Sequence, residues 1–305
     1  MSFIEKSFTG KNQWYLYICS LLIIFIATQI GSIPFSLVKI WENKDVVLSS
    51  GGQMDNLQLN LSISSLSDLA LVLLSFVVGF FAIFFVVKYV HNKKYTDIVT
   101  GRNKIDYGRI LFAIAVWGGI SLVVVFLPLC FSLNASLVYQ FDIEKFIPLL
   151  IISLLLFPFQ IGFEELLFRG YLMQWSIVLF KSPWVALVLT SILFGVMHMN
   201  NPEVAKFGTT LMLPQYIIMG FILGYLAVKD NGLELSIGMH LVNNVFLALI
   251  ISADYAVFQT DSIFRLENAI ISWIDTLVLV LGGAIFIAIC AYKYKFLSNR
   301  DNNFS

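Results

Sequence analysis

Long apolar runs recur along this chain of 305 residues. A bilayer core about 30 Å thick is crossed by roughly 20 apolar residues of helix, and several of the runs reach that length. Hydrophobic residues make up 59% of the chain and charged residues 12%, a balance that one water-soluble core cannot bury. We therefore predict an all-α, polytopic integral membrane protein with about eight transmembrane helices. The predicted spans cover residues 14–35, 66–90, 110–133, 146–180, 183–199, 213–228, 235–252 and 270–292.

Two of these runs allow a second interpretation. The run over 146–180 is too long for one straight span and contains Pro158, so we expect the helix to end or bend there. The run over 14–35 resembles a signal peptide in position. It is long and lacks a clear small-residue cleavage site, so we interpret it as a membrane anchor.

Lysine and arginine are unevenly distributed between the predicted loops. Most of the 19 fall on the side that carries both termini and the linker over 88–109. By the positive-inside rule this side is cytoplasmic, so we expect both termini inside, in the cell membrane. The linker over 37–65, with its Ser49-Ser50-Gly51-Gly52 stretch, is then expected outside as an irregular segment.

The charge balance and the cysteines exclude other classes of protein. Nineteen Lys and Arg balance nineteen Asp and Glu, so the chain lacks the basic surface that nucleic acid requires, and nucleic acid is not an expected partner. Cys19, Cys130 and Cys290 each lie in an apolar run without the spacing of a disulfide framework or zinc cluster. We interpret them as small buried hydrophobic residues.

An acidic pair and an arginine lie inside the fourth run. A charge at the bilayer centre costs about 2.5–3.5 kcal/mol on insertion scales, so these residues require an explanation. On a helix, Glu165 and Arg169 form an i,i+4 pair, whereas Glu164 points about 100° away. We expect Arg169 to neutralise Glu165 and to leave Glu164 as a general base. Taken alone, both glutamates could equally lie in the headgroup zone.

Two of the three histidines, His198 and His240, fall within apolar segments. The third, His91, stands among lysines and is interpreted as a solvated loop residue. A single histidine in an apolar segment is more often a hydrogen-bonded structural residue than a catalyst. If the chain turns back near residue 182, however, Glu164 and His198 differ in depth by only about 3 Å. Asn244 follows His240 by four residues on the same helix face.

These side chains predict an intramembrane pocket with the chemistry of hydrolysis. One base would activate water while imidazole and amide groups stabilise the oxyanion. Alternatively, Glu164, His198 and His240 would hold a divalent metal such as zinc, since two His and one Glu form an accepted catalytic zinc set. No HExxH helix is present, so metal dependence stays open. A serine or cysteine nucleophile is less favoured, because no GxSxG motif occurs.

The remaining polar residues in the spans receive a structural interpretation. We expect them to form interhelical hydrogen bonds or to lie at the interface. They are Gln29, Gln160, Gln174, Gln215 and Asp275. Gly220 and Gly224 form a GxxxG pattern, which predicts close packing of the sixth span beside the site.

Three motifs in order resemble the CPBP family, the CAAX proteases and bacteriocin-processing enzymes also called Abi proteins. The EExxxR motif appears as Glu164-Glu165…Arg169, FxxxH as Phe194…His198, and HxxxN as His240…Asn244. The resemblance covers residues 158–252, roughly a third of the chain. It implies an intramembrane endopeptidase with an all-helical, eight-span fold and an intramembrane active site.

The resemblance also implies a role for each motif residue. Glu164 would activate the hydrolytic water, and His198, His240 and Asn244 would complete the catalytic site. Glu165 and Arg169 would support it. Both a metalloprotease and a glutamate-dependent mechanism without metal are compatible with the resemblance.

We expect three regions: an N-terminal three-span region over 1–140, a CPBP-like catalytic core over 141–252, and the last span with a cytoplasmic tail over 253–305. The leading prediction is cleavage of a small membrane-associated or lipophilic peptide or protein, such as a leader-bearing peptide, a bacteriocin precursor or a prenylated tail. A self-immunity or scaffold protein that binds a peptide without essential proteolysis is the alternative. A transporter is a third class, disfavoured by the absence of an internal repeat.

Overall fold

The computed structural model describes residues 1–44, 63–131 and 136–296. In these residues, six helical runs are long and apolar enough to cross a membrane, and two apolar helices are shorter. All eight fall at the predicted positions, so the prediction of an all-α polytopic membrane protein is confirmed. The Ser49–Gly52 stretch of the expected outer linker lies outside the described residues. Its beginning is helical, however, because the first helix continues to Glu42.

The elements follow one another in a simple order. The N-terminal half contains η1 (Glu5–Phe8), α1 (Trp14–Glu42), α3 (Leu66–Phe85), η3 (Val86–Val90), η4 (Tyr95–Ile98), α4 (Tyr107–Ser121), η5 (Leu122–Phe126), α5 (Leu127–Cys130) and β1 (Ser136–Tyr139). The remainder contains α6 (Ile143–Glu165), η6 (Leu166–Leu172), α7 (Met173–Phe180), α8 (Pro183–Met197), α9 (Pro202–Phe207), α10 (Thr209–Lys229), α11 (Glu234–Leu249), β2 (Ile251–Ala253), β3 (Phe264–Glu267) and α12 (Trp273–Tyr294).

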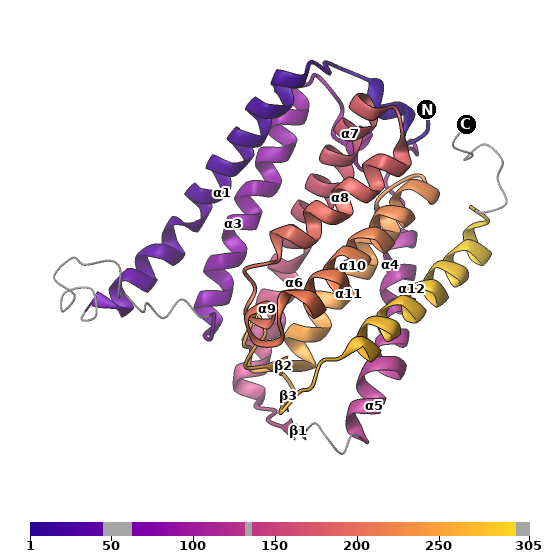
Figure 1. Ribbon diagram of the computed structural model, residues 1–305. Coiled ribbons are helices and arrows are strands. Elements are labelled where there is room, and N and C mark those ends of the chain that lie inside the picture. The colour runs from indigo at the N-terminus through magenta and orange to yellow at the C-terminus, as the bar shows by residue number, and fades with distance from the viewer. Residues whose placement is uncertain (45–62, 132–135, 297–305) are drawn as a thin grey trace.

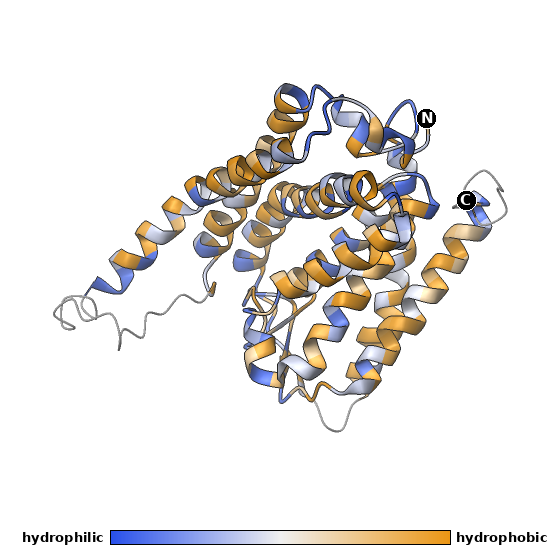
Figure 2. Ribbon diagram, turned by 45° about the horizontal axis from the view of Figure 1, so that its top comes forward, coloured by the Kyte–Doolittle hydropathy of each residue, from blue (hydrophilic) through white to orange (hydrophobic). Residues whose placement is uncertain are grey.

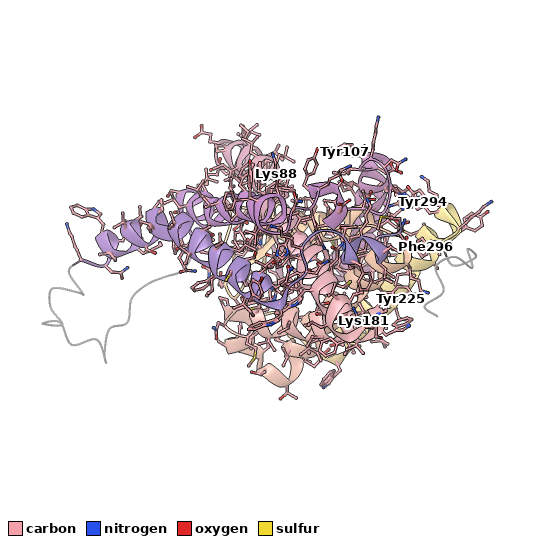
Figure 3. All side chains as sticks on the ribbon, turned by 90° about the horizontal axis from the view of Figure 1, so that it is seen from above. Lys88, Tyr107, Lys181, Tyr225, Tyr294 and Phe296 are labelled. Atoms are coloured by element: carbon pink, nitrogen blue, oxygen red, sulfur yellow. The ribbon has the colours of Figure 1, made fainter. Side chains whose placement is uncertain are left out.

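The helices form one bundle whose connections lie at its two ends (Figure 1). In the interior, α11 contacts α4, α6 and α10, while α6 also contacts α3, and α1 packs on the far side of α3. The start of α1 and the end of α12 lie at the same end of the bundle (Figure 1). Figure 3 views this end, with Lys88 and Lys181 on different parts of it.

A small sheet and the short helix α9 lie at the opposite end of the bundle (Figure 1). Strand β3 is central, antiparallel to β1 and parallel to β2. This sheet takes up Ser252, which we had placed in the seventh span, so that span ends earlier than predicted. Two of the long helices begin with capping boxes: Ser65 and Asp68 form one at α3, and Ser272 and Asp275 form one at α12.

Hydrophobic residues cover the outward faces of the long helices (Figure 2). Phe81, Leu155 and Ile274 are each more than half exposed, at 58%, 62% and 70%. A water-soluble bundle hides such side chains, whereas a lipid-facing surface requires them. The cysteine prediction is right for the buried Cys290 and wrong for Cys19 and Cys130, which lie on this outward apolar surface.

The fourth run is a single helical stretch from Ile143 to Phe180, 38 residues long. It does not end at Pro158, which lies inside α6, so the first of the two expected outcomes, an end of the helix there, is wrong. Membrane helices tolerate an internal proline because neighbouring groups satisfy the freed backbone. The irregularity lies further on, where the backbone widens into the π-helix η6 directly after Glu165. Short π-helical segments are frequent at functional sites.

The predicted close packing of the sixth span is confirmed. A Cβ atom on Gly220 would lie 3.1 Å from the Cα atom of Ser191, and one on Gly224 would lie 2.5 Å from the Cδ1 atom of Leu187. Both neighbours belong to α8, so the two glycines allow α10 to lie directly against it.

Candidate active site

A helical hairpin brings two of the three motifs together. The chain turns at Lys181, which adopts a left-handed conformation, and α8 begins with Ser182 as its cap and Pro183 as its first residue. The predicted turn near residue 182 is therefore confirmed. It lays α8 against η6, where the rings of Phe168 and Phe194 meet at 5.2 Å.

Arg169 pairs with Glu165 inside the protein, as the i,i+4 spacing predicts. Its Nη1 atom lies 2.9 Å from Oε1 of Glu165, and the two side chains are 1% and 0% exposed. Nη2 donates a hydrogen bond to the carbonyl oxygen of Gly220, and the guanidinium lies 4.4 Å from the ring centre of Phe194. Both glutamates are buried among helices, inside a helical run that continues beyond them to Phe180. Arg169 is thus part of the site and not a loop charge.

His240 shares the same carboxylate oxygen. Its Nδ1 atom lies 2.7 Å from Oε1 of Glu165. A carboxylate only accepts, so Nδ1–H is the donor, and in the neutral ring Nε2 carries a free lone pair. Nε2 lies 3.7 Å from Oε2 of Glu164. Glu165 therefore orients the imidazole, and the imidazole presents Nε2 to the second glutamate.

Glu164 lies outside the Arg169–Glu165 ion pair, and one of its two carboxylate oxygens has no hydrogen-bond partner among the described residues. Its Oε1 accepts a hydrogen bond of 3.2 Å from Nε2 of Gln160, while Oε2 is buried without a hydrogen-bond partner among the described residues. Asn244 donates to Oε1 of Gln160 over 3.5 Å. Gln160 thus forms the interhelical hydrogen bond expected of it, to Asn244, and it also contacts Glu164, which we did not predict. Its position four residues before Glu164 is the signal that could have revealed it.

His198 lies at the end of α8 and beside the others, without a direct hydrogen bond to them among those described. Its Nδ1 atom donates to the carbonyl oxygen of Phe194 over 2.7 Å. The Phe194 ring lies 4.5 Å from the ring of His198 and 5.9 Å from that of His240, so both imidazoles flank one aromatic side chain. Tyr216 from α10 stacks on the ring of His198, with ring centres 4.5 Å apart.

Tyr216 connects the site to the loop that follows α8. Its hydroxyl group donates to Oε1 of Glu203 and accepts a hydrogen bond of 3.0 Å from Nδ2 of Asn201. These three residues lie next to His198, and nothing in the spacing of the sequence marks them. They become neighbours only because α10 folds back against α8.

The donor set does not fit a preformed metal site. In the described residues, no group of three or more His, Cys, Asp or Glu side chains is placed to hold a metal ion. Glu164 and His240 face each other, but the described contacts of His198 join it to Phe194 and Tyr216. Metal dependence is left to the chelator experiment, and no chemical step is derived through a metal.

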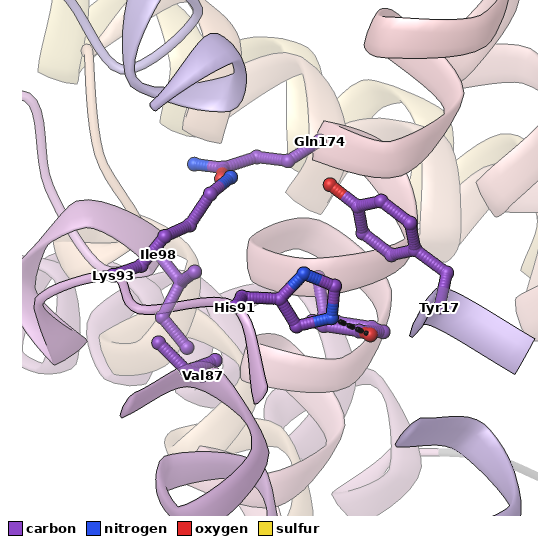
Figure 4. A pocket seen from close by; sticks show the side chains of 7 residues that line it. Tyr17, Val87, His91, Lys93, Ile98 and Gln174 are labelled. Atoms are coloured by element: carbon purple, nitrogen blue, oxygen red, sulfur yellow. Dashed lines mark hydrogen bonds between the residues drawn. The ribbon is translucent and has the colours of Figure 1, made fainter. Parts of the chain in front are cut away.

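The third histidine is not solvated, and our interpretation of His91 was wrong. Its side chain is 1% exposed, with Nδ1 2.7 Å from the carbonyl oxygen of Lys11 and Nε2 2.7 Å from the hydroxyl oxygen of Tyr171. Figure 4 shows the ring beside Tyr17 at a small cavity. Local spacing could not indicate this burial, because the residues that cover His91 come from the N-terminal segment, α1 and η6.

Comparisons with known proteins agree with the three motifs. Residues 145–246 match the family described as Rce1-like, type II CAAX prenyl endopeptidase Rce1-like. The chain is also 26% identical over 299 residues to the uncharacterized protein YyaK of Bacillus subtilis (strain 168), with 96% of each chain covered. The matched segment contains every motif residue, from Glu164 to Asn244. The predicted resemblance is therefore confirmed, and residues 145–246 are similar to the Rce1-like, type II CAAX prenyl endopeptidases of the CPBP family.

Proposed function

We propose that this protein is an intramembrane endopeptidase that hydrolyses a peptide bond in a small membrane-associated or lipophilic peptide or protein. One observation carries the proposal: Oε2 of Glu164 is buried and unpartnered among the described residues, 3.7 Å from Nε2 of His240. Arg169 is occupied by the other glutamate. A carboxylate oxygen without a hydrogen-bond partner can accept a proton from water, and the nearby Nε2 of His240 can accept that proton in turn, so Glu164 is suited to general-base catalysis.

In the proposed reaction, Glu164 takes a proton from a water molecule as the water oxygen attacks the peptide carbonyl carbon. The proton passes to the leaving nitrogen, directly or through Nε2 of His240, and the carbon–nitrogen bond breaks. The Nδ2 group of Asn244 is a donor for the developing oxyanion, since a neutral imidazole whose Nδ1–H is already engaged cannot donate at Nε2. His198 then acts as an acceptor or, once protonated, as a second donor.

Glu165 and Arg169 act on this reaction through His240. The hydrogen bond from Nδ1 to Oε1 of Glu165 fixes the tautomer and the ring orientation. Arg169 compensates the charge of Glu165, so that one buried carboxylate is neutralised and the other remains available. Water activation is assigned to the carboxylate in this mechanism.

We further propose the cell membrane as the location, with both termini in the cytoplasm. The start of α1 and the end of α12 share one end of the bundle (Figure 1). On the expected topology, most of the lysine and arginine residues belong to that side. Helices from the three predicted regions pack together, with α11 against α4 and α12 against α10. The regions before and after the matched segment therefore pack with the catalytic core in one helical bundle.

The test compares peptides made by cells that express wild type, Glu164→Gln, His198→Ala or Glu144→Gln at equal membrane abundance. Glu144 lies exposed in the first turn of the same helix, so its replacement is the matched control. Membrane-bound and released peptides are compared by mass spectrometry. Discrete products should appear with wild type and Glu144→Gln and be absent from the other two. Identical peptides in all four strains, with a phenotype that persists, would instead favour the peptide-binding immunity or scaffold function.

A further inference from the structure

The N-terminal segment packs onto the hairpin that carries the first two motifs. Phe3 is fully buried in the same hydrophobic cluster as Tyr171. Ile4 contacts a second cluster that contains Met173 of α7 and Leu187 of α8. The residues before α1 therefore form a cover over the end of the hairpin, although they are remote from it in sequence.

Polar contacts fix this cover to the linker between α3 and α4. Lys6 donates to the carbonyl oxygen of Thr100 over 2.9 Å, and Lys93 donates to that of Ser7 over 2.9 Å. Gly10 has a φ angle of +68°, which L residues rarely adopt, at the point where the segment passes His91. The segment is thus held by several buried or half-buried hydrogen bonds.

His91 joins the cover to the π-helix. The backbone N–H of Lys11 donates to the carbonyl oxygen of His91 over 2.8 Å, and Nδ1–H of His91 donates to that of Lys11 over 2.7 Å. Because Nδ1 must be the donor, Nε2 of the neutral ring is an acceptor, and the Tyr171 hydroxyl donates to it over 2.7 Å. The Ser20 hydroxyl of α1 is a second, longer partner of Nε2 at 3.3 Å, so Tyr171 is the contact that reaches the π-helix. Tyr171 belongs to η6, two residues beyond Arg169.

The linker also contacts the backbone of η6 directly. A Cβ atom on Gly170 would lie 2.6 Å from the carbonyl oxygen of Ile98, and Gln174 donates to that of Asp97 over 2.7 Å. The π-helix is therefore fixed to the cover and the linker by Gly170, Tyr171 and Gln174. Its Arg169 is directed to Glu165, which in turn holds His240.

We propose that His91 is a positioning residue. The relay Lys11–His91–Tyr171 clamps the π-helix so that Arg169, Glu165 and His240 keep the arrangement that the reaction needs. The consequence for catalysis rests on the proposed function, whereas the clamp on the helix does not. Opening the clamp should loosen η6 and lower kcat without changing KM, because in this proposal the clamp acts through the π-helix and not on the substrate.

Three substitutions separate the two halves of the relay. Tyr171→Phe removes the nearer of the two hydroxyls at Nε2 of His91, the one that belongs to η6, and leaves that of Ser20. His91→Asn keeps a donor near Nδ1 for Lys11 but has no group at the position of Nε2. His91→Gln restores an acceptor at that position. Tyr292→Phe is the matched control, since Tyr292 is 88% exposed on α12.

The experiment measures hydrogen exchange and peptide cleavage on the same purified full-length variants in detergent. Exchange at residues 166–172 should rise about tenfold in Tyr171→Phe and His91→Asn, the factor that corresponds to one hydrogen bond, and stay unchanged in α12. In the same two variants kcat should fall about tenfold at constant KM, and the double variant should be no worse than either single one. His91→Gln keeps an acceptor for Tyr171 but loses the donor to Lys11, so it should recover only the part of the loss that belongs to the Tyr171 contact.

Exchange at wild-type level in both variants overturns the clamp, whatever happens to cleavage. Faster exchange with unchanged kcat overturns the positioning role, provided that Glu164→Gln abolishes cleavage in the same assay. If Glu164→Gln still cleaves, the proposed function fails, while the exchange result continues to decide on the clamp. The two failures are therefore distinguishable.

Discussion

Replacing Arg169 by methionine should be among the most damaging single changes in this protein. The substitution preserves side-chain volume but removes the cation that lies 2.9 Å from Glu165, where both groups are at most 1% exposed. Breaking a buried pair on one side leaves an uncompensated charge, which costs about 3–5 kcal/mol. The double variant Arg169→Met with Glu165→Gln removes both charges and should recover most of that free energy of unfolding, although His240 loses its charged acceptor.

The assay is chemical unfolding in mixed micelles, followed by tryptophan fluorescence. Lys145→Met is the matched control, because Lys145 pairs with Asp261 over 3.3 Å at the surface, with side chains 59% and 54% exposed. An exposed pair of this kind contributes about 0–1 kcal/mol. If Arg169→Met costs no more than this control, or if the double variant is as unstable as the single one, the site is solvated and the assignment of Arg169 to Glu165 is wrong.

Three other perturbations have definite expected outcomes. Gly220→Ala should lower the free energy of unfolding by about 1–3 kcal/mol, measured by thermal unfolding. The new Cβ would lie 3.1 Å from the backbone of Ser191, which cannot move aside as a flexible side chain does. An unchanged stability would contradict the close packing. Burial lowers the pKa of His91 below its usual 6.5 in the folded protein. As the pH falls below about 6.5, the unfolded chain takes up a proton at His91 before the folded protein does, so the free energy of unfolding decreases; above that pH the contribution of His91 is fully present. The decline in melting temperature between about pH 7.5 and 5.5 should be smaller in His91→Asn, which leaves the neighbouring Lys93, Tyr17 and Tyr171 in place, and equal declines would refute the assignment. Treatment with a zinc chelator should leave cleavage unchanged, and a loss that added zinc restores would show that a metal is required.

The sequence predicted those features that depend on local spacing. The eight apolar helices, the pairing of Glu165 with Arg169 and the turn near Lys181 all follow from run length or helical period. The close packing of Gly220 against α8 also followed from a four-residue spacing. In each case the information lies within one helix or one turn.

The features that the sequence did not predict depend on contacts between remote segments. His91 is buried because residues before α1 fold over it, and Tyr216 reaches His198 because α10 returns beside α8. Pro158 does not end its helix, since the membrane-type bundle around α6 tolerates it. Local patterns assign such residues to loops, breaks or packing, and only the assembled bundle shows what they contact.

The most direct test of the central claim is the rate of cleavage by Glu164→Gln on a peptide that wild type cleaves. The substitution keeps the shape of the side chain and an acceptor for Gln160, but it removes the base. Loss of a general base lowers rates by about 10²–10⁴-fold, so kcat should fall by at least about 100-fold at similar KM and equal membrane abundance, while Glu144→Gln stays at the wild-type rate. A kcat within about threefold of wild type would contradict the role of Glu164, because such a change is far below the contribution of a general base.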